Sequence, residues 1–343
     1  MNSSAPSAPR FSVIVPVYNR RDEIEELLSS LAAQVDIPRG LFEVVIVEDG
    51  STDPCGNICE RYAADGLPVS YFYKENEGRS IARNHGMEHA RGEWFLFFDS
   101  DCVIPARYFH DLDSDPRLPE IDSFGGPDAA HESFSPVQKA INFAMTSFLT
   151  TGGIRGGKVS MEKFVPRTFN MGFRREVYDR VGGFREMYSE DIDMSTRIRN
   201  AGFTIALLPD QKVYHKRRVD FKKFFRQVYI FGRSRITLKF LYPGSLKAVH
   251  VLPALFVLGL IALIVLAIVI SPWFLLPLGV YIVALWVAAL ISTRSPHIAT
   301  LAVPASFIQL IGYGTGFLSA FTTKILLGRG RDINEEILAR KGK

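Results

Sequence analysis

Charged residues are absent from two long stretches of this 343-residue chain. No Lys, Arg, Asp or Glu occurs from Ala248 to Thr293, and none occurs from Ser295 to Thr323. Both stretches exceed the roughly 20 apolar residues with which a helix crosses a bilayer. The sequence therefore predicts an integral membrane protein, in preference to a buried helical hairpin inside a soluble core. The predicted spans are about 248–270, 272–293 and 298–323.

Several common signatures are also missing. The three cysteines, Cys55, Cys59 and Cys102, fit a reducing compartment, and the first two lack the partners of a zinc site. No GxGxxG follows the first predicted strand and no GxxxxGKS/T occurs, which argues against an NAD or FAD site and a P-loop. Residues 1–10 contain no apolar run, so they predict a disordered leader rather than a signal peptide. The soluble part is therefore expected to stay in the cytoplasm.

Positive charge gathers beside the apolar region. Ten Lys and Arg lie within 216–247, and the tail at 328–343 is also basic. The first group predicts a multi-pass protein of the inner (cell) membrane whose soluble part is cytoplasmic. Bases alternate with aromatics at 220–241, as in an amphipathic helix of the bilayer interface, although a basic surface helix is the alternative. Three crossings would place the basic tail outside the cell, in conflict with its charge. Two possibilities are left open: the tail is exported despite its charge, or one apolar segment is re-entrant or interfacial and does not cross.

Strand-type and helical segments alternate through the first hundred residues. Apolar runs that end in turn residues are followed by segments whose apolar residues recur at helical spacing. This alternation is typical of an α/β domain with a mostly parallel sheet and helices on both faces, and it predicts a Rossmann-like nucleotide-binding half at 11–101. The predicted strands are 11–18, 42–53, 69–75 and 93–101, and the predicted helices are 21–34, 55–65 and 79–91.

The alternation loosens in the second half of the domain, at 102–215. The segment TTGGIRGGKVS, with four glycines and two bases, indicates a mobile loop at 150–160. The other predicted elements of this half are helices at 135–150, 174–181 and 190–200 and strands at 166–173 and 203–209.

The transmembrane region is expected at 248–327.

Acidic residues follow two of the predicted strands. Asp49 and Asp53 end the second strand, where a carboxylate can accept a hydrogen bond from a base N–H, or Asp53 can cap the next helix. Asp99 and Asp101 lie at the carboxyl end of the fourth strand with only Ser100 between them. Two carboxylates on such a turn can reach one hard divalent cation, Mg²⁺ or Mn²⁺, that also binds a diphosphate. A solvent-exposed turn of Asp and Ser is the alternative.

A third acidic group begins the predicted helix at 190–200. Ser189 is suited to cap this helix, and acids such as Glu190 and Asp191 are favoured in any first helical turn. That preference does not explain why they accompany the other two acidic groups. Together the groups suit nucleotide-diphosphate chemistry, in which a metal offsets charge on a departing diphosphate and a carboxylate deprotonates an acceptor hydroxyl.

Six blocks occur in a recognisable order: PVYN (16–19), VEDGSTD (47–53), NEGRSIARNHG (76–86), FFDSD (97–101), NMGFRREVYDRVGGF (170–184) and EDIDMSTRIRNAGF (190–203). Together they resemble the family 2 glycosyltransferases, which are inverting enzymes of the GT-A fold. The resemblance covers about 11–240, and the C-terminal third is similar to the membrane-anchored branch of the family. It implies a catalytic domain at 11–215, with the acceptor half at 102–215.

The resemblance implies a nucleotide pocket. Pro16 and Tyr18 would line it, and Asp49 would accept a hydrogen bond from the base N–H. Many relatives have a second aspartate where this chain has Glu48. Arg83 would face the base or a phosphate.

The resemblance also implies metal-binding and catalytic roles. Asp99 and Asp101 would form the Asp-x-Asp motif, with Asp101 the direct metal ligand and Asp99 nearer the ribose. His215 would be a further metal ligand, although a structural histidine is the alternative. Asp191 would be the catalytic base, with Glu190 as the second candidate.

Further residues would shape the acceptor and diphosphate region. Asn170, Gly172 and Arg197 would form its floor. Processive relatives carry Gln-x-x-Arg-Trp after the base, whereas this chain has Gln227 and Arg233 in QVYIFGR and no Trp. This departure favours transfer of one sugar per encounter.

The expected function is a metal-dependent inverting transfer from a nucleotide-diphosphate sugar, with uridine as the default base and guanosine open. The acceptor would be a hydroxyl of a membrane-associated molecule, such as a lipid-linked glycan or glycolipid, in the synthesis of cell-surface polysaccharide or glycolipid. One alternative is transfer to a polyprenyl phosphate, which needs no general base. Another is a non-catalytic, membrane-anchored sugar-nucleotide-binding module, against which the intact acids argue. No nucleic-acid partner is expected.

Overall fold

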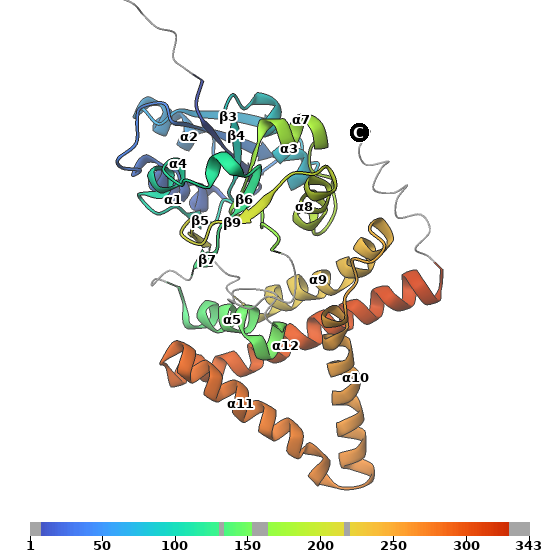
Figure 1. Ribbon diagram of the computed structural model, residues 1–343. Helices are drawn as coiled ribbons and strands as arrows, with labels where there is room; N and C mark the ends of the chain where they lie inside the picture. The colour runs from blue at the N-terminus through green and yellow to red at the C-terminus, as the bar shows by residue number, and fades with distance from the viewer. Residues whose placement is uncertain (1–7, 130–133, 153–163, 216–219, 329–343) are drawn as a thin grey trace, which may run out of the picture. The chain divides into compact units, whose positions relative to one another are not determined.

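The structure, a computed structural model, describes residues 8–129, 134–152, 164–215 and 220–328. The described residues form two compact units (Figure 1). The N-terminal unit contains those of 1–131 and 164–215, and the C-terminal unit contains those of 132–163 and 216–343. One difference from the sequence-based division is that the helical segment predicted at 135–150 groups with the C-terminal unit. Most of the loop predicted at 150–160 lies outside the described residues.

The N-terminal unit is built on a seven-stranded, mostly parallel sheet with the order β3-β2-β1-β4-β8-β6-β9 (Figure 1). β1 pairs in parallel with both β2 and β4, whereas β8 is antiparallel to its neighbours β4 and β6. These strands are β1 (Phe11–Val17), β2 (Phe42–Asp49), β3 (Val69–Lys74), β4 (Trp94–Phe97), β6 (Ser123–Gly125), β8 (Met171–Arg174) and β9 (Ile205–Leu207).

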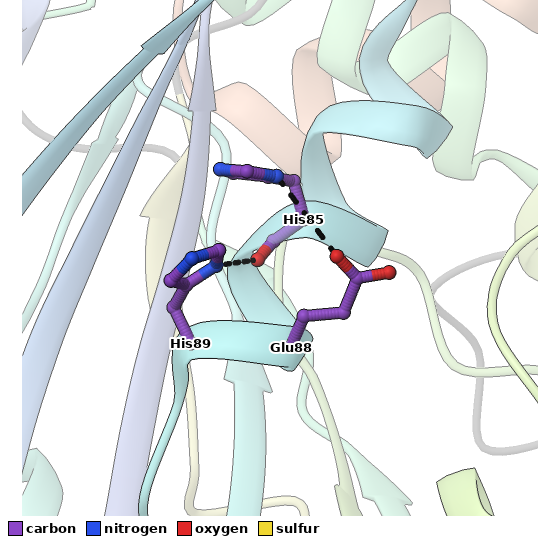
Figure 2. Close-up of side chains that lie close together, drawn as sticks. All are labelled: His85, Glu88 and His89. Carbon is purple, nitrogen blue, oxygen red and sulfur yellow. Dashed lines mark hydrogen bonds and ion pairs between the residues drawn. The ribbon is translucent and has the colours of Figure 1, made fainter.

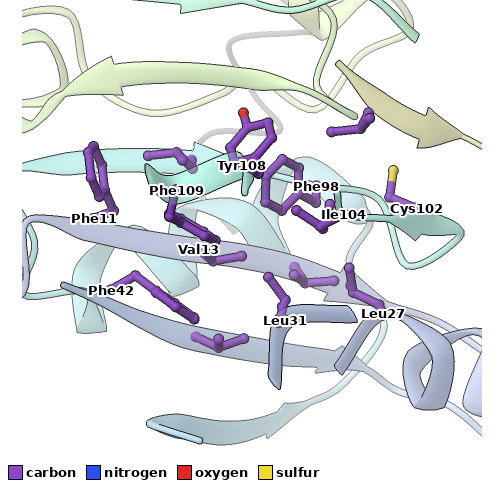
Figure 3. Packing of buried hydrophobic residues seen from close by; sticks show 14 of the residues in the cluster. Phe11, Val13, Leu27, Leu31, Phe42, Phe98, Cys102, Ile104, Tyr108 and Phe109 are labelled. Atoms are coloured by element: carbon purple, nitrogen blue, oxygen red, sulfur yellow. The ribbon is translucent and has the colours of Figure 1, made fainter. Parts of the chain in front are cut away.

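Helices cover both faces of this sheet, as the sequence predicts. Alternate residues of a strand point to opposite faces, so Val13 packs with α1, α2 and α4, while Ile14 packs with α3, α7 and α8. Figure 3 shows the first of these two cores, in which the rings of Phe42 and Phe109 stack with centroids 4.2 Å apart. The helices are α1 (Arg21–Ala32), α2 (Gly56–Ala64), α3 (Arg79–His89), α4 (Tyr108–Asp113), η1 (Leu118–Glu120), α7 (Arg175–Val181) and α8 (Glu190–Asn200).

A second, three-stranded sheet in the same unit has the order β5-β10-β7. It consists of β5 (Cys102–Val103), β10 (Val213–His215) and β7 (Asp128–Ala129). β10 runs antiparallel to β5, with His215 opposite Cys102. This pairing places His215, the last residue of the N-terminal unit, beside the turn that follows β4.

The C-terminal unit is helical. Three stretches of it are long and apolar enough to cross a membrane: Ala248–Val269, Pro272–Thr293 and Pro296–Leu326. The predicted spans are thus confirmed as apolar helices. In the most apolar part of the third stretch 56% of the residues are buried, against 11% in each of the other two, so α12 is the central helix of the unit. Its helices are α5 (Pro136–Thr146), α6 (Phe148–Thr151), α9 (Phe221–Leu241), α10 (Ala248–Val269), η2 (Pro272–Leu275), α11 (Leu276–Thr293), α12 (Pro296–Ala320) and the π-helical η3 (Phe321–Leu326).

Glycines let α9 and α12 approach closely (Figure 1). A Cβ on Gly232 would stand 2.0 Å from the carbonyl oxygen of Tyr313, and one on Gly316 would stand 2.1 Å from that of Tyr229. Small residues have this role where helices pack inside membranes. The basic helix predicted at the interface therefore buries one side against α12, and its place in the bilayer interface stays a prediction.

Candidate active site

Asp99 and Asp101 leave the sheet directly after β4. All four residues of β4 and the following Phe98 are buried, because β4 lies between β1 and β8 and helices cover both faces. The parallel strands β1, β2 and β4 end at the same edge, which is where α/β sheets bind ligands. The apolar run before the two acids is therefore a central strand, and the acids stand at its functional end.

His215 joins the acids through the pairing of β5 with β10. Its Nε2 lies 3.1 Å from Oδ1 of Asp101 and 4.0 Å from Oδ2 of Asp99. Its ring stacks on Phe169 with centroids 4.5 Å apart. The small sheet thus assembles a cluster of two carboxylates and one imidazole from segments more than a hundred residues apart.

The donor atoms of this cluster suit a divalent cation. Ligand atoms of Asp101, Cys102 and His215 lie within 4.8 Å of one another, and Asp99 reaches the same imidazole. The thiol of Cys102 is buried and donates to the carbonyl oxygen of Phe169 at 3.5 Å, which keeps it a packing residue. The remaining carboxylate oxygens are the donors that Mg²⁺ and Mn²⁺ prefer. The residues present therefore fit the expected ion.

Arg83 connects the cluster to the start of α8. Its guanidinium is 1% exposed and donates from Nη2 to Oδ1 of Asp99 at 2.8 Å and from Nη1 to Oε1 of Glu190 at 3.1 Å. The guanidinium carbon also lies 5.7 Å from the ring centroid of Phe184. Two carboxylates and an aromatic ring hold Arg83 in place, and its expected contact with the base or a phosphate stays a prediction.

The acids at the start of α8 have different partners. Glu190 is almost fully buried and also binds Arg79, with 2.9 Å between Oε2 and Nη2. Asp191 is more exposed, accepting from Arg167 at 2.9 Å through Oδ2 and from its neighbour's backbone N–H through Oδ1. Two guanidinium groups thus hold Glu190 and one holds Asp191, and which of the two acids is the base stays a prediction. Ser189 precedes them with a left-handed backbone, and among the described residues its side chain does not cap α8 as expected.

Three arginines near the acids were not identified from the sequence. Arg79 lies one helical turn before Arg83 on α3, a spacing that could have identified it. Arg167 lies in the segment before β8, and Arg185 binds the buried Asp193 at 3.0 Å. No local pattern indicates the last two, because β8 and α7 separate Arg167 from Asp191 and a loop separates Arg185 from Asp193.

Asp49 lies at the end of β2 and is 3% exposed. Its carboxylate accepts from the backbone N–H groups of Glu77 and Gly78, both at 3.0 Å, and from Nζ of Lys74 at 2.9 Å. These contacts fix the turn between β3 and α3. Tyr18, just beyond β1, is 51% exposed and available to a ligand.

The helix after β2 is capped differently from the prediction. Asp53 is 73% exposed and pairs with Arg21 at 3.5 Å, and the N-cap residue of α2 is Cys55. The buried Glu48 accepts from the backbone N–H of Cys55 at 2.8 Å instead. Glu48, the residue that departs from the family pattern, is thus a support of this loop.

Asn170 and Gly172 are interior residues. Asn170 is fully buried, accepts from the Tyr108 hydroxyl at 2.7 Å and donates to the carbonyl oxygen of Gln211 at 2.6 Å. Gly172 packs under the ring of Phe124, where a Cβ would stand 2.4 Å from the nearest ring carbon. Both support the sheet, so any contact with an acceptor or diphosphate stays a prediction.

Arg197 and Arg233 also make structural contacts. Arg197 binds Asp193 at 2.9 Å and donates to the carbonyl oxygens of Val181 and Gly183. Arg233 donates to the hydroxyl of Ser319 on α12 at 3.1 Å. Gln227 and Arg233 belong to the C-terminal unit, so their predicted role near the acceptor stays a prediction.

Family models match most of the chain. Residues 12–113 match the model described as glycosyl transferase family 2. Residues 94–292, more than half of the chain, match the model described as glycosyl transferase family group 2. The chain belongs to the family 2 glycosyltransferases. It is therefore an enzyme of the glycosyltransferase class, with the GT-A fold followed by apolar helices.

Individual relatives share parts of this glycosyltransferase. It is 29% identical over 190 residues to the uncharacterized glycosyltransferase EpsJ of Bacillus subtilis, covering 54% of this chain and 52% of EpsJ. It is 47% identical over 96 residues to the poly(ribitol-phosphate) beta-N-acetylglucosaminyltransferase TarS of Staphylococcus aureus, covering 28% of this chain and 17% of TarS. The chain thus spans about half the length of the first relative and less of the second.

Two solved structures resemble the glycosyltransferase in fold. The mannosyltransferase PcManGT from Pyrobaculum calidifontis, solved with GDP-Man and Mn²⁺, superposes with a TM-score of 0.55 at 22% identity over 95% of this chain and 90% of that one. Residues 1–349 of Staphylococcus aureus TarS, solved with UDP-GlcNAc, give a TM-score of 0.50 at 23% identity over 92% of each chain. At these identities the likeness concerns the fold.

Proposed function

We propose that this family 2 glycosyltransferase carries out a metal-dependent, inverting transfer of a sugar from a nucleotide-diphosphate sugar, with uridine as the default base, to a hydroxyl of a membrane-associated acceptor. The observation that carries the proposal is the chain of contacts at one sheet edge. It runs from His215 and Asp101 through Asp99 and Arg83 to the start of α8, where Asp191 lies.

Asp101 and His215 would hold the metal ion, with Asp99 beside them. A bound Mg²⁺ or Mn²⁺ would offset the negative charge that develops on the departing diphosphate. Arg83 restrains Asp99 on the side away from His215, so the carboxylate keeps one oxygen toward the imidazole. The GDP-Man and Mn²⁺ in the PcManGT structure support an ion of this kind, but do not identify the one used here.

Asp191 would take the proton of the acceptor hydroxyl. As the acceptor oxygen forms its bond to the anomeric carbon, the bond from that carbon to the diphosphate oxygen breaks on the opposite face. The proton ends on the Asp191 carboxylate, and the nucleoside diphosphate leaves with the electron pair. The ion pair with Arg167 orients the carboxylate for this step.

The nucleotide would lie where β1 and β2 end. The exposed ring of Tyr18 offers a surface for the base, with Pro16 on the same strand end. Asp49 would accept from the base N–H. Its carboxylate also fixes the 76–78 turn, so a single residue would couple that turn to base binding.

The apolar helices support a membrane-associated acceptor. Most of α10 and α11 is exposed apolar surface, which in water would be a large solvation cost and in a bilayer is favourable. A lipid-linked glycan or a glycolipid would meet the enzyme at that surface during synthesis of cell-surface polysaccharide or glycolipid. We place the catalytic unit on the cytoplasmic face of the cell membrane, where sugar nucleotides are made.

A panel of nucleotide sugars, each with and without Mn²⁺, tests the donor class. Ligands that bind the folded state raise the melting temperature, so one nucleotide sugar should stabilise the parent enzyme only when the ion is present. In the Asp101→Asn variant, adding the ion should no longer raise the melting temperature. If no nucleotide sugar stabilises the enzyme, or if the ion has no effect, the donor assignment is wrong.

Transfer assays with membrane lipid extract test the acceptor class. Asp191→Asn should abolish transfer to a hydroxyl acceptor while leaving donor binding intact. Undiminished transfer by Asp191→Asn would point to a phosphate acceptor such as a polyprenyl phosphate, which needs no base, and would overturn the hydroxyl assignment.

A further inference from the structure

Two histidines and a glutamate gather on the C-terminal part of α3, in the segment HGMEH. Figure 2 shows His85, Glu88 and His89 side by side on the helix. Their ligand atoms all lie within 4.8 Å of one another. The contacts that define the candidate active site do not include these three residues.

We propose that His85, Glu88 and His89 form a second metal site, one that binds a divalent cation of the zinc type. Residues four apart on a helix share one face, and a His pair at this spacing is a recurrent zinc-binding arrangement. Two imidazoles and one carboxylate form a zinc ligand set whose fourth position is left to water. The same donors discriminate against Mg²⁺, which prefers oxygen ligands.

A hydrogen bond fixes the tautomer of His89. Nδ1 of His89 lies 2.8 Å from the backbone carbonyl oxygen of His85. A carbonyl oxygen only accepts, so Nδ1 carries the proton, and the His89 ring would have to turn before Nε2, which has the lone pair that a metal needs, faces Glu88 (Figure 2). A metal-bound histidine typically donates its other N–H to such a carbonyl, which fixes the tautomer and the ring orientation.

Packing also restrains both rings. The ring of Phe72 lies 5.7 Å from the ring of His85 in an edge-on contact and 4.3 Å from the ring of His89, measured between centroids. The two imidazole rings themselves lie 4.4 Å apart. Phe72 belongs to β3, so packing against this strand holds the two imidazole rings near each other.

The remaining adjustment is small. Nδ1 of His85 lies 4.0 Å from Oε2 of Glu88, whereas two ligands about 2.0–2.2 Å from a tetrahedral zinc ion stand about 3.3–3.6 Å apart. Glu88 is 59% exposed and free to rotate toward the rings. Rotation of the Glu88 side chain, and of the His89 ring with loss of its bond to the carbonyl oxygen of His85, would bring the three ligands together.

The protonation state agrees with this geometry. Burial lowers the pKa of His85, and the neighbouring His89 and Lys74 lower it further, while Glu88 opposes them. A lower pKa favours the neutral imidazole, the form in which histidine binds a metal. The ion would cross-link consecutive turns of α3, the helix that carries Arg79 and Arg83 at its other end.

Zinc binding to the full-length protein, purified without a histidine tag and kept in excess Mg²⁺, tests the site. Calorimetric titration and metal analysis should find one more zinc equivalent in the parent than in His89→Gln. The matched control is His110→Gln, which changes an exposed histidine on α4 and should bind zinc as the parent does. Zinc should also raise the melting temperature of the parent and of His110→Gln, but not of His89→Gln.

Two further variants separate this site from the candidate active site. Asp101→Asn should keep the zinc equivalent, and Glu88→Gln should weaken it. His89→Gln should transfer sugar at the parental rate with Mg²⁺ or Mn²⁺, because His89 lies outside the proposed machinery. The proposal is overturned if His89→Gln binds as much zinc as the parent, or if Asp101→Asn removes the zinc instead.

Discussion

Arg83 hydrogen-bonds to Asp99 and Glu190 through two nitrogens of one buried guanidinium, at 2.8 Å and 3.1 Å. The arginine belongs to α3, Asp99 follows β4, and Glu190 begins α8. A single side chain thus ties together three elements that lie far apart in the sequence. Asp191, the neighbour of Glu190, is positioned relative to Asp99 and Asp101 through this contact.

Arg83→Lys should separate this positioning role from simple charge. Lysine keeps the positive charge but lacks the fixed fork that reaches two carboxylates, so one charge-assisted hydrogen bond should be lost. We expect stability to fall by about 1.5–3 kcal/mol. Melting of the full-length protein in detergent, followed through the fluorescence of the buried Trp94 among others, measures this change. Parental stability and activity would show that the bridge is dispensable.

Asp191→Asn and Glu190→Gln should impair the enzyme differently, the first through kcat and the second through donor binding. Loss of a general base costs about 10²–10⁴ in rate, so Asp191→Asn should lower kcat by that amount with little effect on donor KM. Glu190→Gln keeps the hydrogen-bonding shape and should mainly weaken donor binding, because Arg79 and Arg83 lose the charge that holds them. Steady-state kinetics of both variants make the comparison. A larger fall in kcat for Glu190→Gln than for Asp191→Asn would mean that Glu190 is the general base.

The elements around the site could be predicted from the sequence because local patterns encode them. The central strand before Asp99 is apolar throughout since both of its faces are covered, and the alternation of strands and helices fixes which strand ends meet. The place of the acids at the sheet edge follows from those two facts. The apolar helices follow from the absence of charge alone.

Local patterns do not predict the partners of the acids, and His215 was expected beside Asp101 only from the family resemblance. His215 reaches Asp101 only because β10 pairs with β5, two very short strands with no readable pattern. Capping of α2 by Asp53 was one of two possibilities that the sequence left open, but the side chain of Asp53 does not cap α2, and the buried Glu48 accepts from the N–H of Cys55, which depends on how the loop closes. Such contacts are decided by tertiary packing, which residue spacing does not encode.

Asn170→Ala should reduce stability rather than catalysis. Its side chain links the Tyr108 hydroxyl to the carbonyl oxygen of Gln211 in the interior, and removal leaves both groups without this partner. Each unsatisfied buried polar group costs about 1–3 kcal/mol. Thermal melting should therefore show a clear decrease, whereas kcat per folded molecule at low temperature should stay at the parental value. Asn57→Ala, at an exposed position, is the control and should change neither the melting temperature nor kcat.

Gly316→Leu should disrupt the packing of α9 against α12. A Cβ at Gly316 already stands 2.1 Å from the carbonyl oxygen of Tyr229, so a larger side chain forces the helices apart. Gly279→Leu on α11 is the matched control, because a Cβ there meets no atom within 4 Å. Melting in lipid nanodiscs should show a large decrease for the first variant and little change for the second. Equal melting temperatures would mean that the close helix contact contributes nothing to stability.

The rate of sugar transfer by Asp101→Asn tests the central claim most directly. Since metal-ion catalysis supplies several kcal/mol of transition-state stabilisation, the rate should fall by about 100-fold or more, and added Mn²⁺ or donor should not restore it. Asp65→Asn, an exposed acid at the end of α2, should transfer at the parental rate. If Asp101→Asn also transferred sugar at the parental rate, the cluster of Asp99, Asp101 and His215 would not be the catalytic metal site.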